Sequence, residues 1–140
     1  MILLDTNVIS EPLRAAPEPR VVAWLDAQLL ETLFLSVITV AELRFGVARM
    51  LRGRRRNSLN ERVETQILPA FAGRVLTFDL AATQTYADLM AKAEAAGQSI
   101  AMADGMIAAI AKANGMTVAA RDIAPFEAAG VSVIDPCSNI

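Results

Sequence analysis

Four acidic residues stand out because each one interrupts or ends a stretch of apolar sequence. They are Asp5 after Ile-Leu-Leu, Glu42 within Val-Ala-Glu-Leu, Asp104 as the only charge in a long run rich in alanine and isoleucine, and Asp122 after Ala-Ala-Arg. An isolated buried carboxylate is costly unless it is paired or binds a cation. Four such residues on separate elements indicate one acidic pocket for a hard divalent ion.

The composition narrows the available chemistry to carboxylates. The chain has no histidine, which excludes a histidine general base, a serine–histidine–aspartate triad and a histidine-ligated metal. A single cysteine, Cys137, excludes an internal disulfide and a cysteine-rich zinc site. As a nucleophile, Cys137 would lack a histidine to activate it. What remains for hydrolysis is carboxylate oxygen with Mg2+ or Mn2+.

Each of the four acids also has a purely structural explanation. Asp5 begins Asp-Thr-Asn, which is typical of turns, and Asp122 precedes a proline-containing turn that it could cap. Glu42 follows Thr39 at the spacing of a capping box, in which it would reach back to the threonine amide. Asp104 could face solvent, although its neighbours at helical spacing are apolar. One shared site explains all four together, and the sequence favours it for that reason.

Polar and basic neighbours extend the candidate site. Thr6, Asn7 and Thr39 are able to hydrogen-bond a carboxylate or a metal-bound water, and each serves equally well as a cap. Arg121 either pairs with a carboxylate or meets a substrate phosphate. The arginine-rich segment 52–56 either grips phosphates or forms a solvated helix end.

The hydrophobic pattern predicts the elements that position these residues. Short apolar runs predict strands at 2–4, 33–37, 75–78, 116–120 and 131–134, and helical spacing predicts helices at 21–30, 39–51, 59–67, 81–96 and 100–114. Strands that alternate with helices favour an α/β fold, with a central parallel sheet of about four to five strands flanked by helices. The carboxyl ends of such strands share one edge of the sheet. We expect the four acids to meet there, with Glu42 in the first turn of its helix.

A single domain is expected for residues 1–140, because this length suffices for one core. With 54% hydrophobic residues and a net charge of −2, the chain is not a disordered one. The apolar runs are too short to span a bilayer and the N-terminus lacks a signal-peptide pattern, so we expect a cytoplasmic protein without membrane association. We also expect the helical face formed by Leu59, Val63 and Ile67 to contribute to a homodimer.

Taken together, these stretches resemble the PIN-domain ribonucleases, specifically the VapC-type toxins of toxin–antitoxin modules, and among them the FitB-like branch. The motifs that carry the resemblance are MILLDTNVISE at 1–11, TVAELRFGV at 39–47, ADGMIAA at 103–109, and ARD at 120–122 with Phe126 and Gly130 following. They cover nearly the whole chain in the family's order. The fourth motif departs from the pattern of many relatives, since Ala120 stands where they have threonine and Asp122 where they have asparagine.

The resemblance implies a PIN-like fold and a metal-dependent endoribonuclease of a type II toxin–antitoxin module. In this family a metal-activated water attacks the RNA phosphodiester and leaves a 5′ phosphate. Asp5, Glu42 and Asp104 would hold Mg2+ or Mn2+, and Asp122 would complete the cluster. The resemblance also implies a homodimer and a small cognate antitoxin of the ribbon-helix-helix type. Operator DNA would be contacted only through that antitoxin.

Two other functions remain open from the sequence. A phosphohydrolase of the haloacid-dehalogenase type also begins with a strand and an aspartate, but it needs a second aspartate where this chain has Asn7. A catalytically silent PIN fold that binds RNA or protein is the other alternative, and the presence of all four acids argues against it. Metal-dependent cleavage of RNA by the purified protein separates the three.

Overall fold

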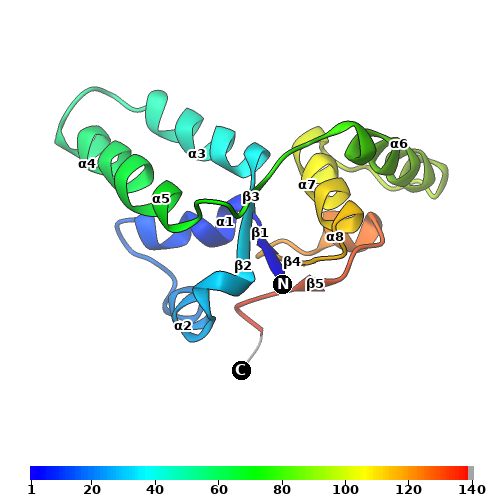
Figure 1. The fold of residues 1–140 in the computed structure, drawn as a ribbon, viewed down its shortest axis with the longest axis horizontal. Helices are drawn as coiled ribbons and strands as arrows, with labels where there is room; N and C mark the ends of the chain where they lie inside the picture. The colour runs from blue at the N-terminus through cyan, green and yellow to red at the C-terminus, as the bar shows by residue number, and fades with distance from the viewer. Residues whose placement is uncertain (139–140) are drawn as a thin grey trace.

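A parallel sheet forms the centre of the protein. The computed structural model describes residues 1–138, and Figure 1 shows the sheet between two groups of helices. The strands are β1 (Ile2–Leu4), β2 (Leu33–Ser36), β3 (Val75–Leu76), β4 (Thr117–Ala119) and β5 (Val133–Ile134), in the spatial order β3-β2-β1-β4-β5. Every neighbouring pair is parallel, which confirms the predicted α/β fold.

Helices cover both faces of this sheet. Along the chain they are α1 (Thr6–Ile9), α2 (Pro19–Ala27), α3 (Val37–Ala48), α4 (Arg54–Arg62), α5 (Leu68–Ala70), α6 (Leu80–Ala95), α7 (Met102–Ala113) and α8 (Ala124–Ala128). Short 3-10 turns lie at Glu11–Leu13 and Leu30–Thr32, and a π-helical turn at Val63–Ile67 joins α4 to α5. In Figure 1, α3, α4 and α5 lie on one side of the sheet, and α6, α7 and α8 lie on the other.

The sheet separates two hydrophobic cores, because successive side chains of a strand point to opposite faces. Leu3 of β1 packs into a core with α6, α7 and α8, which we call the α7 core. Leu4 packs into a core with α1, α2, α3 and α4, which we call the α3 core. In β4, Val118 lies in the α7 core and Ala119 in the α3 core. This burial on both faces explains why the strands read as continuous apolar runs.

The strand order places the carboxyl end of β1 at a switch point. From β1 the chain moves outward to β2 and β3 on one side, and later fills β4 and β5 on the other. In open α/β sheets, ligands bind in the crevice that forms where the order reverses. Asp5 follows β1 directly, and its N–H donates to the carbonyl of Ala119 at the end of β4 (2.9 Å). The backbone of Asp5 is therefore fixed at the mouth of this crevice.

The predicted elements agree with the structure except at their ends and in two short helices. Residues 6–9 and 124–128, which were not predicted as helices, form α1 and α8. The prediction that Leu59, Val63 and Ile67 contribute to a dimer is wrong, because Leu59 and Val63 are buried in the α3 core and Ile67 packs against it. Within residues 1–138, no helix is both long and apolar enough to cross a membrane.

Candidate active site

The four predicted carboxylates gather beyond the carboxyl ends of β1 and β4. Asp5 follows β1, Asp122 lies in the loop after β4, Asp104 lies in the first turn of α7, and Glu42 projects from α3. They are close enough that the charges of Asp104, Glu42 and Asp122 all act on Asp5. The structure thus brings together residues from two strand ends and two helices at one edge of the sheet.

Asp5 is the buried member of this group, with 5% of its surface exposed. Its side chain makes no capping hydrogen bond to α1, so the turn-cap explanation is wrong. Burial is the main cause that raises the pKa of Asp5 to about 7; the nearby backbone amide of Thr6 opposes the rise, and the charges of Asp104, Glu42 and Asp122 add to it. A carboxylate in this position is costly to ionise without a cation.

The other three acids are more open to water. Asp104 is half-buried, and burial followed by the charges of Glu42 and Asp122 raises its pKa above the usual range. Glu42 and Asp122 are exposed. The argument that burial of a carboxylate calls for a cation is therefore strong for Asp5 and weaker for the half-buried Asp104. Glu42 and Asp122 are assigned to the group by their position alone.

Glu42 is held by a row of hydroxyl groups and takes no part in a helix cap. Ser36 caps α3 by accepting the N–H of Thr39 on its Oγ atom (3.1 Å). Because α3 begins at Val37, Glu42 lies in the second turn; the predicted first-turn position and the capping-box alternative are both wrong. Oε1 of Glu42 accepts the hydroxyl of Thr6 at 2.5 Å, and Thr6 Oγ1 lies 3.1 Å from Oγ1 of the buried Thr39. Both threonines therefore support a carboxylate of the site.

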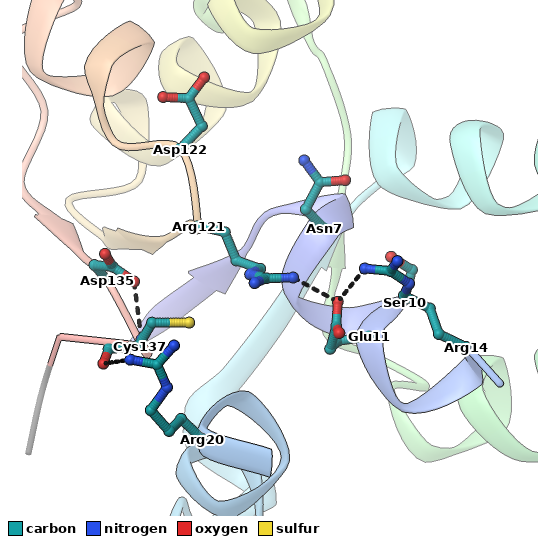
Figure 2. Close-up of a pocket in the computed structure, with 9 residues that line it drawn as sticks. All are labelled: Asn7, Ser10, Glu11, Arg14, Arg20, Arg121, Asp122, Asp135 and Cys137. Carbon is teal, nitrogen blue, oxygen red and sulfur yellow. Dashed lines mark hydrogen bonds and ion pairs between the residues drawn. The ribbon is translucent and has the colours of Figure 1, made fainter. Parts of the chain in front are cut away.

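Asp122 has a structural contact as well as a place in the acidic group. Its Oδ1 atom accepts the N–H of Ala124 at 3.3 Å, so the predicted turn cap at the start of α8 is present. Beside Asp122 opens a cavity of about 600 Å³, which we call the arginine cavity (Figure 2). The residues that matter for its chemistry are Asn7, Glu11, Arg14, Arg20, Arg121 and Asp122. Asn7 thus faces the same opening as Asp122.

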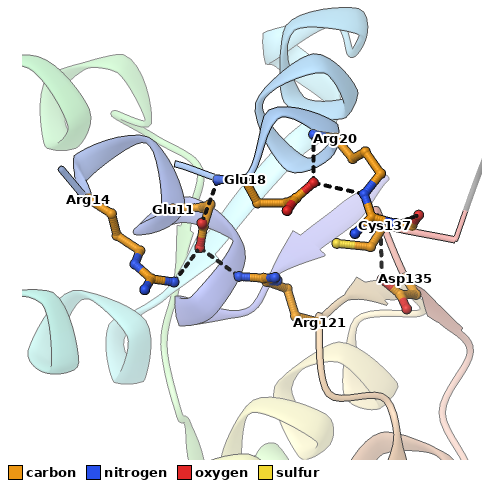
Figure 3. Close-up of polar contacts among 7 residues, drawn as sticks. All are labelled: Glu11, Arg14, Glu18, Arg20, Arg121, Asp135 and Cys137. Carbon is orange, nitrogen blue, oxygen red and sulfur yellow. Dashed lines mark hydrogen bonds and ion pairs between the residues drawn. The ribbon is translucent and has the colours of Figure 1, made fainter. Parts of the chain in front are cut away.

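A buried glutamate, Glu11, lies against this cavity and was not predicted as a site residue. It is 2% exposed. Its Oε2 atom accepts Nη1 of Arg121 at 2.8 Å and Nη1 of Arg14 at 3.5 Å, and its Oε1 atom accepts the backbone N–H of Glu18 at 2.8 Å (Figure 3). Burial acts to raise the pKa of Glu11, but the Glu18 amide and the two guanidiniums hold it below its usual range. Of the two roles predicted for Arg121, pairing with a carboxylate is confirmed.

The arginine-rich segment 52–56 has a structural role in part. Nη2 of Arg55 donates to the carbonyl of Leu13 at 2.7 Å. Arg56 donates to the carbonyls of Val47 (3.2 Å) and Ala48 (3.4 Å) at the end of α3. The last carbonyls of a helix lack partners within the helix; Arg56 adds a donor to two of them, of which Val47 also accepts the backbone N–H of Met50 at 3.1 Å. The segment lies at the start of α4, where Arg55 is exposed, as the helix-end alternative predicts; phosphate binding stays a prediction.

The donor chemistry of the four acids fits a hard divalent cation. Carboxylate oxygen is the ligand type that suits Mg2+ and Mn2+. The neighbouring charges that act on Asp5 and Asp104 come from carboxylates, and a cation would relieve this repulsion. In the described part of the chain, no three acidic or cysteine side chains stand close enough to form a ready-made ligand cluster. Glu42 accepts the hydroxyl of Thr6, and Asp122 accepts the N–H of Ala124.

Comparisons with known proteins agree with this fold. The PIN domain family matches residues 2–131. The chain is 60% identical to the VapC ribonuclease Y4jK of Sinorhizobium fredii over 97% of each protein. It is 57% identical to the toxin FitB of Neisseria gonorrhoeae, over 97% of this chain and 98% of that protein. A solved structure of FitAB bound to an IR36 DNA fragment superposes with a TM-score of 0.95 at 57% identity, covering 98% of this chain and 96% of that one.

These matches span almost the entire length of both partners in each comparison. They rule out the dehalogenase alternative, because the PIN domain match over residues 2–131 covers strands β1 to β4 and all eight α-helices described here. The chain belongs to the PIN domain family, in the branch that contains the VapC ribonuclease Y4jK and the toxin FitB.

Proposed function

We propose that this protein is a metal-dependent endoribonuclease and the toxin of a type II toxin–antitoxin module. The observation that carries the proposal is the group of four carboxylates at the carboxyl ends of β1 and β4, namely Asp5, Glu42, Asp104 and Asp122. Two relatives at 60% and 57% identity are named as a ribonuclease and as a toxin, which supports the same activity here.

The proposed roles follow from the position of each side chain. Asp5, Glu42 and Asp104 hold Mg2+ or Mn2+ and Asp122 completes the set; the bound cation supplies a Lewis acid and an activated water for hydrolysis of the phosphodiester bond. Asp5 brings a carboxylate whose ionisation is opposed by burial and by its neighbours, so it gains most from a cation. Thr6 donates to Oε1 of Glu42, which orients that carboxylate and leaves its second oxygen free.

The partners are proposed from the same relatives. In the solved FitAB structure a second component, FitA, accompanies FitB, and the complex is bound to DNA. This supports a cognate antitoxin for this chain and contact with operator DNA through that antitoxin. We infer a ribbon-helix-helix antitoxin, a homodimer, an RNA substrate and a cytoplasmic location. Phe45 on α3 and Leu80 on α6 are 64% and 87% exposed, and apolar side chains of this size on a surface support contacts with other proteins.

The direct test is cleavage of RNA by the purified protein with Mg2+, with Mn2+ and in EDTA. We expect products with a 5′ phosphate in the presence of metal and no cleavage in EDTA. Asp104→Asn should lower the rate at least about a hundredfold, the scale of losing a major electrostatic group. Asp88→Asn, an exposed acid on α6, is the matched control and should cleave at the wild-type rate.

Each outcome separates the candidate functions. Full cleavage in EDTA refutes the metal-dependent mechanism. An Asp104→Asn variant that cleaves like the wild type removes Asp104 from the site. A folded wild-type protein that binds RNA yet cleaves none with either metal supports the catalytically silent binding module instead.

A further inference from the structure

The arginine cavity borders the proposed catalytic group, yet most of its lining residues have no part in that group. Asp122 and Asn7 lie at its catalytic side, and the rest of the lining includes three arginines: Arg14, Arg20 and Arg121 (Figure 2). Its volume of about 600 Å³ is in the range of sites that hold small ligands. A cavity with this lining opens beside the proposed site of RNA hydrolysis and is accessible to a neighbouring part of the same strand.

Arg121 is the arginine best prepared to bind an anion in this cavity. The buried carboxylate of Glu11 accepts one of its N–H groups at 2.8 Å and fixes the guanidinium, whose side chain is 32% exposed. A guanidinium has five N–H donors, so donors remain for a ligand. Arg14 and Arg20 are more exposed, at 64% and 58%; Arg14 reaches Glu11 only at 3.5 Å, and Arg20 pairs at 2.8 Å with Glu18, whose side chain is 27% exposed. Ordering a donor in advance reduces the entropy that binding must overcome.

Chain connectivity links this guanidinium to the proposed site of cleavage. Arg121 directly precedes Asp122, and consecutive Cα atoms are about 3.8 Å apart. Both residues line the arginine cavity, so an anion held by Arg121 lies in the same opening as Asp122. Glu11, which follows α1, ties the loop of Arg121 to the segment that begins at Asp5.

We propose that the arginine cavity binds a backbone phosphate of the RNA strand adjacent to the cleaved bond, with Arg121 as the donor and Glu11 as the residue that positions Arg121. The inference rests on the proposed ribonuclease function and names a substrate subsite for it. Arg121 contacts the substrate, whereas Glu11 acts through Arg121.

The charges around the cavity argue for recognition by geometry. Three arginines face three carboxylates, Glu11, Asp122 and Asp135, so the lining has no excess of positive charge. Glu11 is buried and its charge is balanced by ion pairs with Arg121 and Arg14, whereas Asp135 accepts the backbone N–H of Cys137 at 2.8 Å. The planar fork of a guanidinium matches two oxygens of a phosphate, which a diffuse positive potential does not do.

Binding of a fluorescein-labelled single-stranded RNA, measured by anisotropy in EDTA at several salt concentrations, tests the proposal without cleavage. Arg121→Ala should weaken binding about tenfold, the scale of one charge-assisted hydrogen bond. It should also reduce the slope of log K against log salt by about 0.7, the value for one phosphate contact on a single strand. Lys112→Ala removes the same charge at the exposed far end of α7 and should change neither quantity.

Glu11→Gln separates positioning from simple charge. It makes the protein more positive, so a purely electrostatic effect predicts tighter RNA binding. A positioning role predicts binding weakened about threefold, with the salt slope retained because Arg121 is still present. Arg121→Lys should keep the slope and lose affinity, since lysine lacks the fork. Thermal melts show whether each variant is folded. If Arg121→Ala does not fold, Glu11→Gln and Arg121→Lys still test the proposal.

The proposal is overturned if Arg121→Ala and Lys112→Ala bind RNA equally well, if Glu11→Gln binds more tightly than the wild type, or if the wild type does not bind the RNA. A wild type that binds with these dependences but cleaves no RNA in Mn2+ refutes the proposed catalytic function and leaves the phosphate subsite standing. With active protein, the same variants should raise KM in preference to lowering kcat.

Discussion

The pKa of Asp5 leads to a prediction about stability that does not depend on catalysis. Burial and the neighbouring carboxylates raise this pKa from 3.8 to about 7. A shift of about three units corresponds to about 4 kcal/mol between the two protonation states. Because the folded-state pKa is the higher one, the protonated form stabilises the fold. This contribution is fully present below the unfolded value and is lost as the pH rises through about 7.

Asp5→Asn removes this titration while keeping the size and shape of the side chain. The new amide has donors that the surrounding acids can accept, and any donor left unpaired costs about 1–3 kcal/mol at every pH. Metal-free wild type should therefore lose up to about 4 kcal/mol of unfolding free energy between about pH 4 and pH 8, from Asp5 alone. The variant should lack this loss, so its stability relative to wild type should rise with pH over that range.

Urea unfolding of both proteins in EDTA, at a series of pH values with the m-value checked for constancy, measures this difference. Mn2+ should stabilise the wild type most near and above neutral pH, because Asp5 is then ionised, and should stabilise the variant less. If the difference in unfolding free energy between the two proteins is the same at both ends of the pH range, Asp5 titrates normally, and the reasoning from burial and repulsion fails.

Two further variants test the supports of the site. Thr6→Val removes the hydroxyl that Glu42 accepts at nearly constant shape; cleavage or Mn2+ affinity, measured by titration, should fall about tenfold or more, the range for losing a partner of a ligating carboxylate. Gly105→Ala would place a Cβ atom 2.7 Å from Sδ of Met90 and 3.1 Å from Cε2 of Tyr86. Since the methionine end is flexible, the expected cost is about 1–3 kcal/mol of unfolding free energy, and a variant as stable as wild type would show that α6 and α7 separate easily.

The acids that sequence reasoning identified most securely are the ones whose local surroundings are unusual. Asp5 follows a buried strand, and Asp104 interrupts the apolar run that becomes α7. Hydrophobic periodicity reports these positions directly, because the apolar run beside each acid is continuous in the sequence. The same property explains why the parallel sheet and its flanking helices were predictable.

Features that depend on contacts between distant segments were not predictable in this way. Glu11 lies in Ser-Glu-Pro, a pattern typical of an exposed turn, and its burial depends on Arg121, which is 110 positions away. The start of α3 was misplaced because Ser36 and Thr39 are both good caps. Which of the two residues caps α3 depends on where β2 ends. The end of a strand is set by its pairing with neighbouring strands, which the local sequence does not reveal.

The division of the interior into two cores links the metal affinity of the site to the packing of both cores. Glu42 stands on α3, whose buried face belongs to the α3 core, and Asp104 stands on α7, which belongs to the α7 core. Asp5 and Asp122 follow the two central strands between them. A cation held by these acids would link the helices of the α3 core to those of the α7 core. Otherwise these two parts of the protein are joined through a sheet whose strands are two to four residues long. Metal affinity is then a measure of how well the two halves are docked, and a substitution deep in either core should weaken it without touching an acidic residue.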